Sequence, residues 1–574
     1  EPHLWLQRRL GLPTPPSPAR ARRALQEGIE ALAGELGPRA ARLAEEWPRL
    51  QREHALVALG LPPERARELD LDPEAVRANP YLGLLEGLSL GEAHTLAARL
   101  GLQALYPQGA LLAHLLEQGR LGHTFVPAPG PLGAVEQGLW RPEGPVVRLE
   151  GGWAGLERWV RAEEEILQAF RRPVPGTLRL APPPGYPLTA EQRQVLALLE
   201  RGSGLLTGGP GTGKSHTCAA VVAACEQARL EVLLLAPTGK AAVRLAELTG
   251  RQAHTIHARL GWDGRGFRHG PLDPLPADVV LVDEAAMADV ELLRALLAAL
   301  APRTRVLLVG DADQLPPVGP GAPFQDLLRL GLPQVRLTRL QRRAQDHPVT
   351  LASYAVREGR LPPPLEQPGL HWRLDLGEEA TLGAIVAEVE RVWRRTGRRP
   401  QVLVPLYRGV LGIDNLNRAL KERLNPAPDP AARGTLRLQG LCVSPGDPLV
   451  QTRNDYALGL ANGQLMEVEH LDERGLLVRL DDGHRLRVPR RAARWLRHAY
   501  ALSVHRAQGS QWPCVMLALA AGHGEFPNRE LLYTALTRAQ DSAWLFGDFG
   551  AYRAALERRA GLRQTWLSRL RQEG

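Results

Sequence analysis

The stretch Gly208-Gly209-Pro210-Gly211-Thr212-Gly213-Lys214-Ser215 decides the fold of this chain. It follows a short apolar run at 204–207 and precedes a stretch that favours a helix. The glycines let the backbone curl so that its N–H groups face an anion, and the helix N-terminus adds a favourable dipole. This arrangement is typical of a phosphate-binding loop. A plain Gly-rich turn is the alternative, but lysine is scarce in the chain, occurring only at 214, 240 and 421.

A phosphate-binding loop of this kind predicts ATP and Mg²⁺ as the bound cofactors. We expect Lys214 to reach the β- and γ-phosphates and Ser215 to ligate Mg²⁺. The nucleotide-contacting residues that we expect in this loop are Gly209, Pro210, Gly211, Thr212, Gly213, Lys214, Ser215 and His216.

Two acids follow the apolar run at 279–282, namely Asp283 and Glu284. Acids at the end of a buried strand are costly unless they have a role. We expect Asp283 to hold Mg²⁺ through water and Glu284 to activate the attacking water. Helix-capping acids are the alternative when this pair is taken alone, and the phosphate-binding loop upstream favours the catalytic interpretation.

A third apolar run, at 306–309, leads into the loop 310–319. Gln314 in this loop is a candidate sensor of the γ-phosphate or of the attacking water, because an amide can both donate and accept hydrogen bonds. The prolines that follow stiffen the loop, so that a small shift is passed on. An ordinary Pro-rich turn is the alternative.

Short apolar runs alternate with helical stretches from about residue 188 onward, which predicts a parallel sheet with crossover helices. Residues 1–172 are predicted to form a mostly helical domain, and the Pro-rich stretch 173–187 a linker. Within the helical region, residues 79–93 are typical of two short helices joined by a tight turn. Such a helix–hairpin–helix unit can point N–H groups at phosphates, and a purely structural hairpin is the alternative. A strand or winged element is expected near 122–126.

The composition narrows the function classes further. The net charge is +9 with a pI near 9.7, which favours a polyanionic partner, although an Arg-rich composition arises without one. Four cysteines without metal-ligand spacing exclude a disulfide framework and fit a reducing, cytoplasmic setting. No long apolar run or signal pattern occurs, so we expect no membrane span. The sequence starts at Glu1 without Met, and we expect that residues precede it.

Taken together, these motifs resemble the RecD-type branch of the superfamily 1 helicases. The likeness extends over about 188–545 through six further motifs. They are Leu188–Gln192, Ala236–Ala242, His254–His257, Leu337–Arg343 and the pair Ser503–Ser510 and Leu532–Ala539. The late motif has Ser503, Arg506 and Ala507 where the family favours Thr, Lys and Ser.

The resemblance implies a multidomain α/β fold with two RecA-like parallel-sheet motor domains. The first, 1A, is expected at 188–346 and carries a small β-hairpin insertion, 1B, at about 258–275. The second, 2A, is expected at 347–427 and 498–574, interrupted by an SH3-like β-barrel, 2B, at 428–497. The α-helical N-terminal domain at 1–172 resembles the extension of the longer RecD-type proteins.

The resemblance also implies roles for single residues. Gln192 would read the adenine, and Arg342 and Arg538 would be arginine fingers on a lobe opposite Lys214. The DNA-binding residues expected on both lobes and on the barrel are Pro237, Thr238, Lys240, His257, Asn454, Val504, His505 and Gln508. Asn454, with Tyr456, is equally well explained as a turn residue.

The 1B insertion contains Trp262, Arg265 and Phe267 around a Gly-Arg-Gly tip. In the family a pin at this place separates an arriving duplex, and we therefore expect a strand-separating pin. A solvent-exposed loop is the alternative.

The sequence thus predicts an ATP-hydrolysing DNA helicase that moves 5′-to-3′ on single-stranded DNA and opens duplexes in repair or recombination. The polarity comes from the resemblance alone. An RNA or RNA–DNA helicase and a non-unwinding ATP-dependent translocase or switch are the alternatives. We expect a monomeric, nucleoid-associated motor whose partners are single-stranded DNA and single-strand/duplex junctions, and the N-terminal region is a candidate surface for a protein partner. A nuclease subunit is a further alternative, but the sequence contains no carboxylate–lysine nuclease cluster, so any nuclease would be a partner chain.

Overall fold

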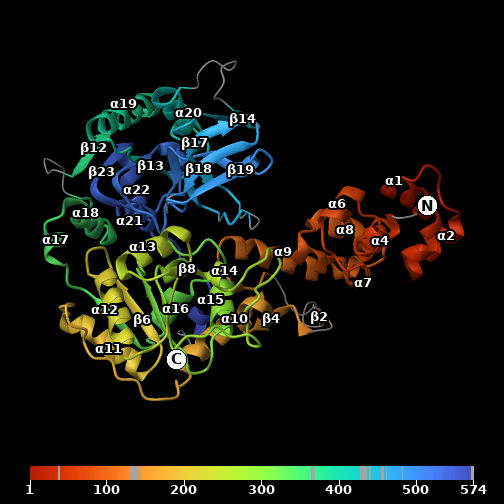
Figure 1. Ribbon diagram of the computed structural model, residues 1–574, viewed down its shortest axis with the longest axis horizontal. Coiled ribbons are helices and arrows are strands. Elements are labelled where there is room, and N and C mark those ends of the chain that lie inside the picture. Colours follow the sequence, from red (N-terminus) through yellow and green to blue (C-terminus); the bar gives the residue numbers. More distant parts are fainter. Residues whose placement is uncertain are drawn as a thin grey trace. The chain divides into compact units, whose positions relative to one another are not determined.

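The computed structural model describes residues 1–570 except 37–38, 130–139, 142–143, 363–368, 427–435, 439–440, 454, 456–457, 461 and 481–482. The chain divides into two compact units, Glu1–Arg161 and Ala162–Gly574, which are described separately (Figure 1). None of the helices in the described part of the chain combines the length and the apolar character that a membrane span requires.

The first unit is mainly helical, as expected for this region. Apolar side chains from its first helices, among them Leu6, Leu32 and Trp47, form a core. Its helices are α1 (Pro2–Leu10), α2 (Pro18–Glu27), α3 (Ala33–Leu36), α4 (Arg39–Ala44), α5 (Trp47–Leu59), α6 (Pro63–Glu68), α7 (Pro73–Ala78), the 3₁₀ helix η2 (Pro80–Glu86), α8 (Leu90–Arg99) and α9 (Tyr106–Arg120).

A small antiparallel sheet follows the helices, in the order β1-β5-β4. It comprises β1 (Phe125–Pro127), β4 (Val147–Glu150) and β5 (Trp153–Leu156), and a separate two-residue pair joins β2 (Trp140–Arg141) to β3 (Gly144–Pro145). The strand element expected near 122–126 is therefore present. Helix α10 (Glu157–Arg171) crosses the division between the units, which falls at residue 161 rather than at the expected 172.

The turn between η2 and α8 corresponds to the predicted helix–hairpin–helix. Gly87 adopts a left-handed conformation with φ of 95°, and its N–H donates to carbonyls of η2. The Leu88 N–H donates to the Gly83 carbonyl, and the Ser89 N–H donates to the Glu92 carboxylate. Ser89 and Glu92 form a capping box at the start of α8. Because these three N–H groups are satisfied internally, the geometry favours a structural hairpin.

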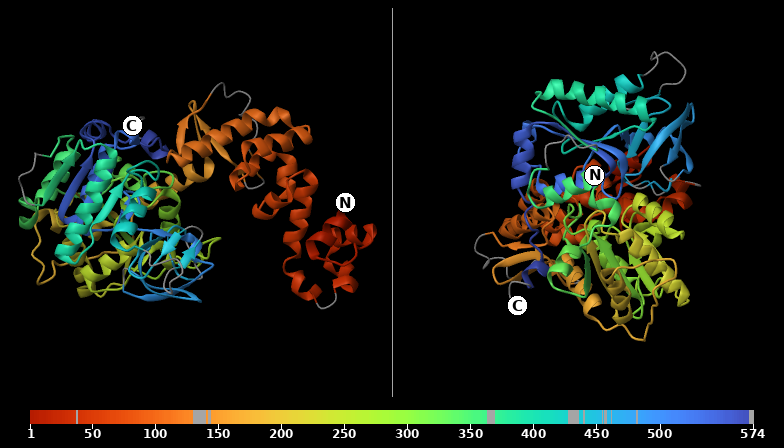
Figure 2. Two further views of the ribbon diagram at one scale, coloured as in Figure 1. Left: turned by 90° about the horizontal axis from the view of Figure 1, so that it is seen from above. Right: turned by 90° about the vertical axis from the view of Figure 1, so that its left-hand side faces the viewer.

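The second unit contains a six-stranded parallel sheet, the first motor sheet, in the order β11-β6-β10-β9-β7-β8. The chain moves one way across the sheet from β6 to β7 and the other way from β9 to β10, so right-handed crossovers put helices on both faces. Figures 1 and 2 show this layering. The strands are β6 (Gly204–Gly208), β7 (Val232–Ala236), β8 (Ala253–Thr255), β9 (Val279–Val282), β10 (Arg305–Gly310) and β11 (Gln334–Leu337).

The strands of the first motor sheet are almost wholly apolar because both faces are covered. The helices of this domain are α11 (Ala190–Arg201), α12 (Lys214–Gln227), α13 (Gly239–Thr249), α14 (Ile256–Arg259), α15 (Val290–Ala298) and α16 (Pro323–Arg329). The linker expected at 173–187 contains neither helix nor strand.

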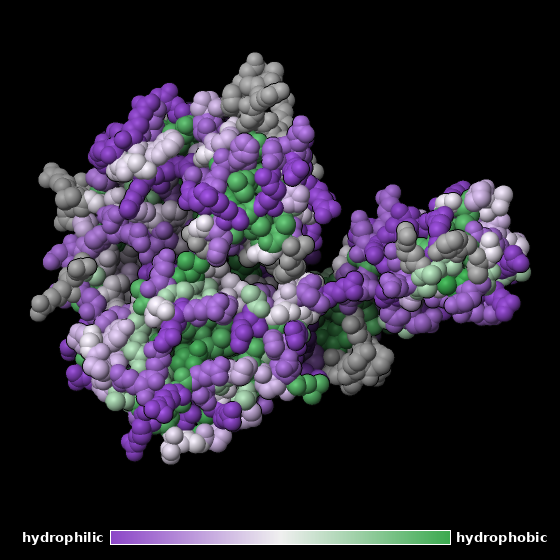
Figure 3. Space-filling view, in the orientation of Figure 1, coloured by the Kyte–Doolittle hydropathy of each residue, from purple (hydrophilic) through white to green (hydrophobic). Residues whose placement is uncertain are grey.

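The second motor sheet is also parallel, in the order β12-β23-β22-β13-β21. Ile385, Val389 and Val392 of α19 pack into its core, and the outward side of that helix is strongly hydrophilic (Figure 3). The strands are β12 (Leu370–Leu374), β13 (Gln401–Val404), β21 (Ala501–Ser503), β22 (Trp512–Leu519) and β23 (Ala539–Gly547). The helices are α17 (Arg342–Gln345), α18 (Pro348–Arg357), α19 (Glu378–Thr396), α20 (Ile413–Leu424), α21 (Arg529–Leu536) and α22 (Phe549–Glu557).

The insertion between α20 and β21 folds around an antiparallel sheet in the order β19-β18-β17-β16-β20. Its strands are β16 (Pro448–Gln451), β17 (Leu465–Asp472), β18 (Gly475–Leu480), β19 (Arg485–Pro489) and β20 (Leu496–His498), and β14 (Leu436–Leu438) pairs with β15 (Leu441–Val443). An all-β insertion was expected here, and its assignment to the SH3-like barrels stays a prediction.

A buried ion cluster joins this antiparallel sheet to the second motor sheet. Asp447 is fully buried at the start of β16, and its carboxylate accepts hydrogen bonds from Lys421 of α20 and from Tyr500, 2.8 and 2.7 Å away. Burial alone would raise the pKa of Asp447, but His498, Lys421 and Tyr500 together hold that pKa below its usual range. The ionised carboxylate therefore ties α20 to both sheets.

Two further segments of the motor region bear on the sequence expectations. The insertion at 258–275 contains no strand; isolated bridges join Gly270 to Asp273 and Leu275 to Leu300, and the expected β-hairpin stays a prediction. The chain reverses here: the His269 N–H donates to the Leu260 carbonyl, and the Asp263 carboxylate accepts from the N–H groups of Arg265 and Gly266 in the turn. The last helix, α23 (Trp566–Leu570), packs against α16 and thus against the first motor domain, although the sequence placed 498–574 in the second.

Candidate nucleotide site and nucleic-acid interface

The predicted phosphate-binding loop lies between β6 and α12, at the carboxyl edge of the first motor sheet. Gly211 and Gly213 have φ of 74° and 93°, a conformation that residues with a Cβ rarely adopt. The Lys214 Nζ donates to the carbonyls of Gly208 and Gly209, and the Thr212 hydroxyl donates to the Gly209 carbonyl at 2.9 Å. The loop is thus curled around the lysine that is expected to meet the phosphates.

Gln192 lies beside this loop, although it comes from α11. Its side-chain oxygen accepts the Thr189 N–H at 2.9 Å in a capping box, which fixes the side chain. Its Nε2 is buried and has no hydrogen-bond partner, and a Cβ on Gly213 would lie 2.8 Å from it. An unpaired buried donor costs free energy unless a ligand accepts from it. The residues therefore fit a nucleotide whose base accepts this hydrogen bond.

Asp283 and Glu284 directly follow strand β9, as the sequence predicts, and β10 lies between β9 and β6 in the sheet. Burial and the adjacent Glu284 raise the pKa of Asp283 to about 6. A divalent cation would reverse this effect, because it favours the ionised form. Glu284 has φ of 51°, a left-handed conformation that costs about 1–3 kcal/mol in a residue other than glycine. Such strain is typical of functional sites, and Asp283 with Ser215 would supply the protein oxygens for Mg²⁺.

Gln314 follows β10, the next strand of the sheet, and is buried. Its amide lies near Asp311, whose carboxylate accepts a hydrogen bond from the Tyr533 hydroxyl at 2.7 Å. The next residue, Leu315, makes two hydrogen bonds with the second motor domain. Its N–H donates to the Thr534 hydroxyl at 2.9 Å, and its carbonyl accepts from the Gln508 side chain at 3.1 Å. The loop is therefore fastened across the seam between the two motor sheets.

The structure describes the side chain of one of the two expected arginine fingers, Arg538. Arg538 is buried within the second motor domain and donates to the carbonyls of Thr534 and Ser510 and to the Thr537 hydroxyl. Burial lowers the pKa of its guanidinium, and the charges of Glu284 and Asp311 in the first motor domain act in the opposite direction. Arg342 lies in α17, and its side chain is outside the described residues.

Sequence reasoning missed two residues that contact the phosphate-binding loop. The Gln341 N–H donates to the Gly211 carbonyl at 2.8 Å. The Tyr354 hydroxyl, from α18, donates to the Pro210 carbonyl at 3.3 Å. Burial raises the pKa of Tyr354 to about 12, and the Arg357 guanidinium lies 4.4 Å from its ring centre. No motif marks Tyr354, because its role depends on a contact between segments far apart in the sequence.

The expected DNA-binding residues of the first motor domain lie at the start of α13. Thr238 caps that helix, and Lys240 places its ammonium 4.7 Å from the centre of the Trp512 ring of β22. A Cβ on Gly509 would lie 2.6 Å from the Thr238 hydroxyl. Pro237 immediately precedes this cap, at the end of β7. This edge of the first sheet therefore meets the second motor domain directly.

Two of the remaining DNA-binding candidates are histidines, His257 and His505. His257 lies against Trp262 and Phe267, with ring centres 6.3 and 5.8 Å away, and burial lowers its pKa. Burial also lowers the pKa of His505, so both rings are neutral near pH 7.

The side chains of the late motif are less accessible than the sequence suggests. Val504 is fully buried, so its backbone alone could face a strand, and Gln508 is engaged with Leu315. Asn454, like Tyr456, lies outside the described residues. Of the pin residues, Trp262 and Phe267 pack together with ring centres 4.6 Å apart, whereas Arg265 is exposed in the turn.

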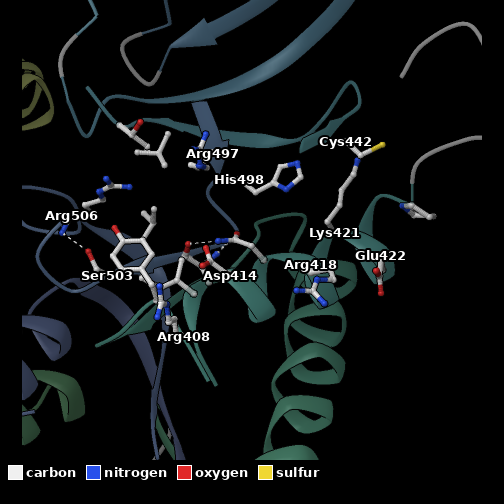
Figure 4. Close-up of a pocket in the computed structure, with 18 residues that line it drawn as sticks. Arg408, Asp414, Arg418, Lys421, Glu422, Cys442, Arg497, His498, Ser503 and Arg506 are labelled. Atoms are coloured by element: carbon white, nitrogen blue, oxygen red, sulfur yellow. Dashed lines mark hydrogen bonds between the residues drawn. The ribbon is translucent and has the colours of Figure 1, made fainter. Parts of the chain in front are cut away.

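A cavity of about 1000 Å³ lies between α20, the antiparallel sheet and the start of the late motif. Figure 4 shows side chains from these three elements converging on it. Arg408 and Arg418 are exposed, and the Arg506 guanidinium lies 5.8 Å from the Tyr407 ring centre. Its basic lining exceeds its acidic lining, which consists of Asp414 and Glu422. The cavity therefore suits an anionic polymer.

Comparison with known proteins finds two family matches within this chain. Residues 187–376 match a family described as an AAA domain, and residues 498–546 match the UvrD-like helicase C-terminal domain. The RecBCD enzyme subunit RecD of Mycolicibacterium smegmatis is 32% identical over 488 residues, covering 75% of this chain and 84% of that protein. The chain belongs to the RecD-type superfamily 1 helicases. This family comprises ATP-hydrolysing DNA helicases.

A second relative of this RecD-type chain is longer than the matched region. The ATP-dependent RecD2 DNA helicase of Deinococcus radiodurans is 41% identical over 384 residues, covering 66% of this chain and 52% of that protein. The chain thus spans about half the length of this relative. Solved structures of Pif1 helicases from Bacteroides, bound to single-stranded DNA, and from Candida albicans are 17% and 19% identical. They cover 62% and 64% of this chain and 92% and 96% of theirs, with TM-scores of 0.39 and 0.40, and the assignment rests on the sequence relatives.

Proposed function

We propose that this chain is a 5′-to-3′ DNA helicase in which ATP hydrolysis at the seam between the motor sheets drives movement along single-stranded DNA. The observation that carries the proposal is the loop after β10, which holds Gln314 and whose Leu315 is bonded to both Gln508 and Thr534. A movement of this loop when ATP binds or is hydrolysed would therefore shift Gln508, which belongs to the late motif of the second motor domain. The polarity and a role in repair or recombination rest on family membership.

The chemistry at the seam follows from the positions of the chain's own groups. Lys214 and the N–H groups of its loop would bind the phosphates, and Glu284 would take a proton from the attacking water. Asp283 and Ser215 would hold Mg²⁺, which neutralises phosphate charge when bound. Arg538 would stabilise negative charge that develops on the γ-phosphate. Closing of the seam brings these groups together, and opening releases the products.

The strand itself would pass over the carboxyl edges of both sheets. We infer that its phosphates bind in the basic cavity of Figure 4, beside Arg408 and Arg418, and then meet Thr238 and Lys240. Such contacts are independent of base sequence and depend strongly on salt. Trp262 and Phe267 present an aromatic surface that could stack on a base at the junction, which is the role proposed for the pin.

The polarity test uses two duplexes, one with a 5′ and one with a 3′ single-stranded tail. ATP-dependent unwinding of the 5′-tailed duplex alone supports the proposal, and unwinding of the 3′-tailed duplex alone contradicts it. Replacing the DNA tail by RNA separates a DNA helicase from an RNA or RNA–DNA helicase. ATPase stimulation by DNA without unwinding of either duplex would indicate a translocase or switch.

The pin is tested by Trp262→Ala with Phe267→Ala in the full chain. We expect loss of unwinding while stimulation of the ATPase by single-stranded DNA is retained. Arg265→Ala, in the exposed turn of the same loop, separates a charge effect from an aromatic effect. If the double variant unwinds at the normal rate, the pin role is refuted.

The strand path is tested with Arg418→Ala, because this side chain is exposed in the cavity. Removing one phosphate contact should reduce the slope of log affinity against log salt by about 1. Arg423→Ala is the matched control, since Arg423 is on the same helix but pairs with Glu390. An unchanged slope for Arg418→Ala would show that the strand does not bind in this cavity.

A further inference from the structure

The segment after α22 leaves the second motor domain and returns to the first. We name residues 558–570 the C-terminal strap. At its start, the Arg558 carbonyl accepts from the Arg529 N–H, and the Ala560 N–H donates to the Glu530 carboxylate at 2.7 Å. Both partners belong to α21 of the second motor domain. The strap therefore begins as part of that domain.

The far end of the strap is anchored in the first motor domain and in helix α10, which precedes that domain in the chain. The Thr565 hydroxyl donates to Asp326 of α16 at 2.8 Å, and the Leu567 N–H donates to Glu163 of α10 at 2.9 Å. Both acids are about 1% exposed, and Leu567 is fully buried. These contacts fix the strap's end firmly, because breaking either would leave a buried carboxylate short of a partner.

Arg563 stands between these two ends. Its guanidinium donates to the carbonyls of Pro317, Gly319 and Gly321. These residues form the loop 316–321, which continues directly from Gln314 and Leu315. Burial lowers the pKa of Arg563 to about 10, so the side chain remains charged near neutral pH. Charged donors make the stronger hydrogen bonds to carbonyls.

The loop 316–321 has few other ways to keep its conformation. The Pro320 carbonyl accepts from the Val290 N–H at 3.1 Å, and Gly321 has φ of 76°. A Cβ on Gly319 would lie 2.0 Å from the Asp289 carboxylate, so the loop passes close to α15. Gln314 and Arg563 also line one cavity of about 500 Å³. A change at Arg563 is thus transmitted to Gln314 through a short, proline-stiffened segment.

We propose that Arg563 is a positioning residue for ATP hydrolysis, which holds the loop 316–321, and with it Gln314, in the conformation that the reaction requires. Because Arg563 lies on a strap that begins in the second motor domain, the position of Gln314 depends on the relative orientation of the two motor domains. This inference rests on the proposed ATPase, and it adds a second link across the seam to the one made by Gln508 and Thr534.

The experiment compares the full-length wild type with Arg563→Gln and Arg559→Gln, by kcat and KM for ATP with and without oligothymidine. Arg559 is the matched control: it is on the same strap, exposed, and in the described part of the chain its side chain makes no hydrogen bond. We expect Arg563→Gln to lower kcat by about ten- to hundredfold, since small misplacements of catalytic groups have effects of this size. KM for ATP should change by less than about twofold, because the phosphate-binding loop is untouched.

A conservative variant separates positioning from folding. The ammonium of Arg563→Lys offers three donors for the same three carbonyls, so kcat should be largely restored at pH 7. Burial lowers the pKa of a lysine, and kcat should therefore fall as pH rises through that pKa. Arg559→Lys should show no such fall. If Arg563→Gln does not fold, as judged by thermal unfolding, this pH profile decides the question.

The outcomes are distinct. A kcat of Arg563→Gln within twofold of that of Arg559→Gln overturns the proposal, as does a pH profile of Arg563→Lys that matches that of Arg559→Lys. A lower unfolding temperature with unchanged kcat per folded molecule also overturns it. Absence of ATPase activity in the wild type would instead refute the proposed function.

Discussion

Two glycine-containing turns in this chain lead into helices, yet only one of them offers groups to a ligand. In the turn at 87–89, the N–H groups donate to carbonyls of η2 and to Glu92. At the phosphate-binding loop, Gln192 keeps an unpaired buried donor and Glu284 nearby has a strained backbone. Similar local sequence therefore does not imply similar chemistry. What distinguishes a site is unsatisfied polar groups and strain that the surrounding fold maintains.

The largest effect is expected at the phosphate-binding loop, the turn that offers groups to a ligand. Lys214→Gln removes the charge that is curled into the phosphate-binding loop. We expect ATP hydrolysis to fall at least about a thousandfold, since electrostatic stabilisation of the transition state is usually the largest single contribution. Steady-state phosphate release, with and without single-stranded DNA, measures it. Ordinary turnover by this variant would remove the basis for any ATP-driven function.

Arg538→Ala tests whether the second motor domain completes the site. We expect ATP binding to persist and hydrolysis to fall by about 10³, the size associated with an arginine finger. Binding of a fluorescent ATP analogue and single-turnover hydrolysis separate the two steps. Arg553→Ala, an exposed arginine of the same domain, is the control. A loss confined to analogue binding would give Arg538 a different role.

The pH dependence of Mg²⁺ binding sharpens the comparison further. The pKa of Asp283 is raised to about 6, so protons compete with the cation below that pH. Above pH 6 the Asp283 carboxylate is ionised and no longer contributes to the pH dependence of the affinity. Below it, the apparent dissociation constant for Mg²⁺ should rise by up to about tenfold per pH unit, as for any single competing proton. Titration of Mg²⁺ in the presence of ATP at pH 5.0 and 7.5 measures this, and Asp283→Asn should leave only the smaller dependence that protonation of ATP itself causes.

The smallest effect is expected at the N-terminal turn. Ser89→Ala removes a helix cap and should lower the free energy of unfolding by about 1 kcal/mol, as cap removal typically does. Affinity for single-stranded DNA should be unchanged, because the N–H groups of this turn already have partners. Chemical denaturation and fluorescence anisotropy measure the two quantities. A marked loss of DNA affinity would restore the phosphate-binding interpretation of this turn.

Much of the site could be predicted from sequence, because a parallel sheet brings the ends of its strands to one edge. Lys214, Asp283 and Gln314 each follow an apolar run, and that rule alone places them together. Tyr354 and Arg563 could not be found in this way. Each acts through a hydrogen bond to a carbonyl more than a hundred residues away. Every residue has a backbone carbonyl, so the sequence does not show which of them accepts such a bond.

The β-hairpin predicted at 258–275 shows the opposite limit. Its glycines and turn residues are those of a hairpin, but local contacts decide the outcome. Asp263 caps two N–H groups of the turn, and Phe267 packs back onto Trp262. These contacts fix the turn, and backbone bonds such as that from the His269 N–H to the Leu260 carbonyl run across it without forming an assigned strand. Periodicity over a few residues cannot distinguish such a turn from a strand ladder.

The ion cluster around Asp447 has a mechanical consequence. Because Lys421 and Tyr500 bind the same buried carboxylate, the antiparallel sheet and α20 should rotate as one rigid body. The basic cavity that they enclose would keep a constant width throughout the ATPase cycle, while only the seam between the motor sheets opens and closes. A bound strand would thus be displaced without being released by this half of the motor, and distances measured across the cavity would stay fixed as those across the seam vary.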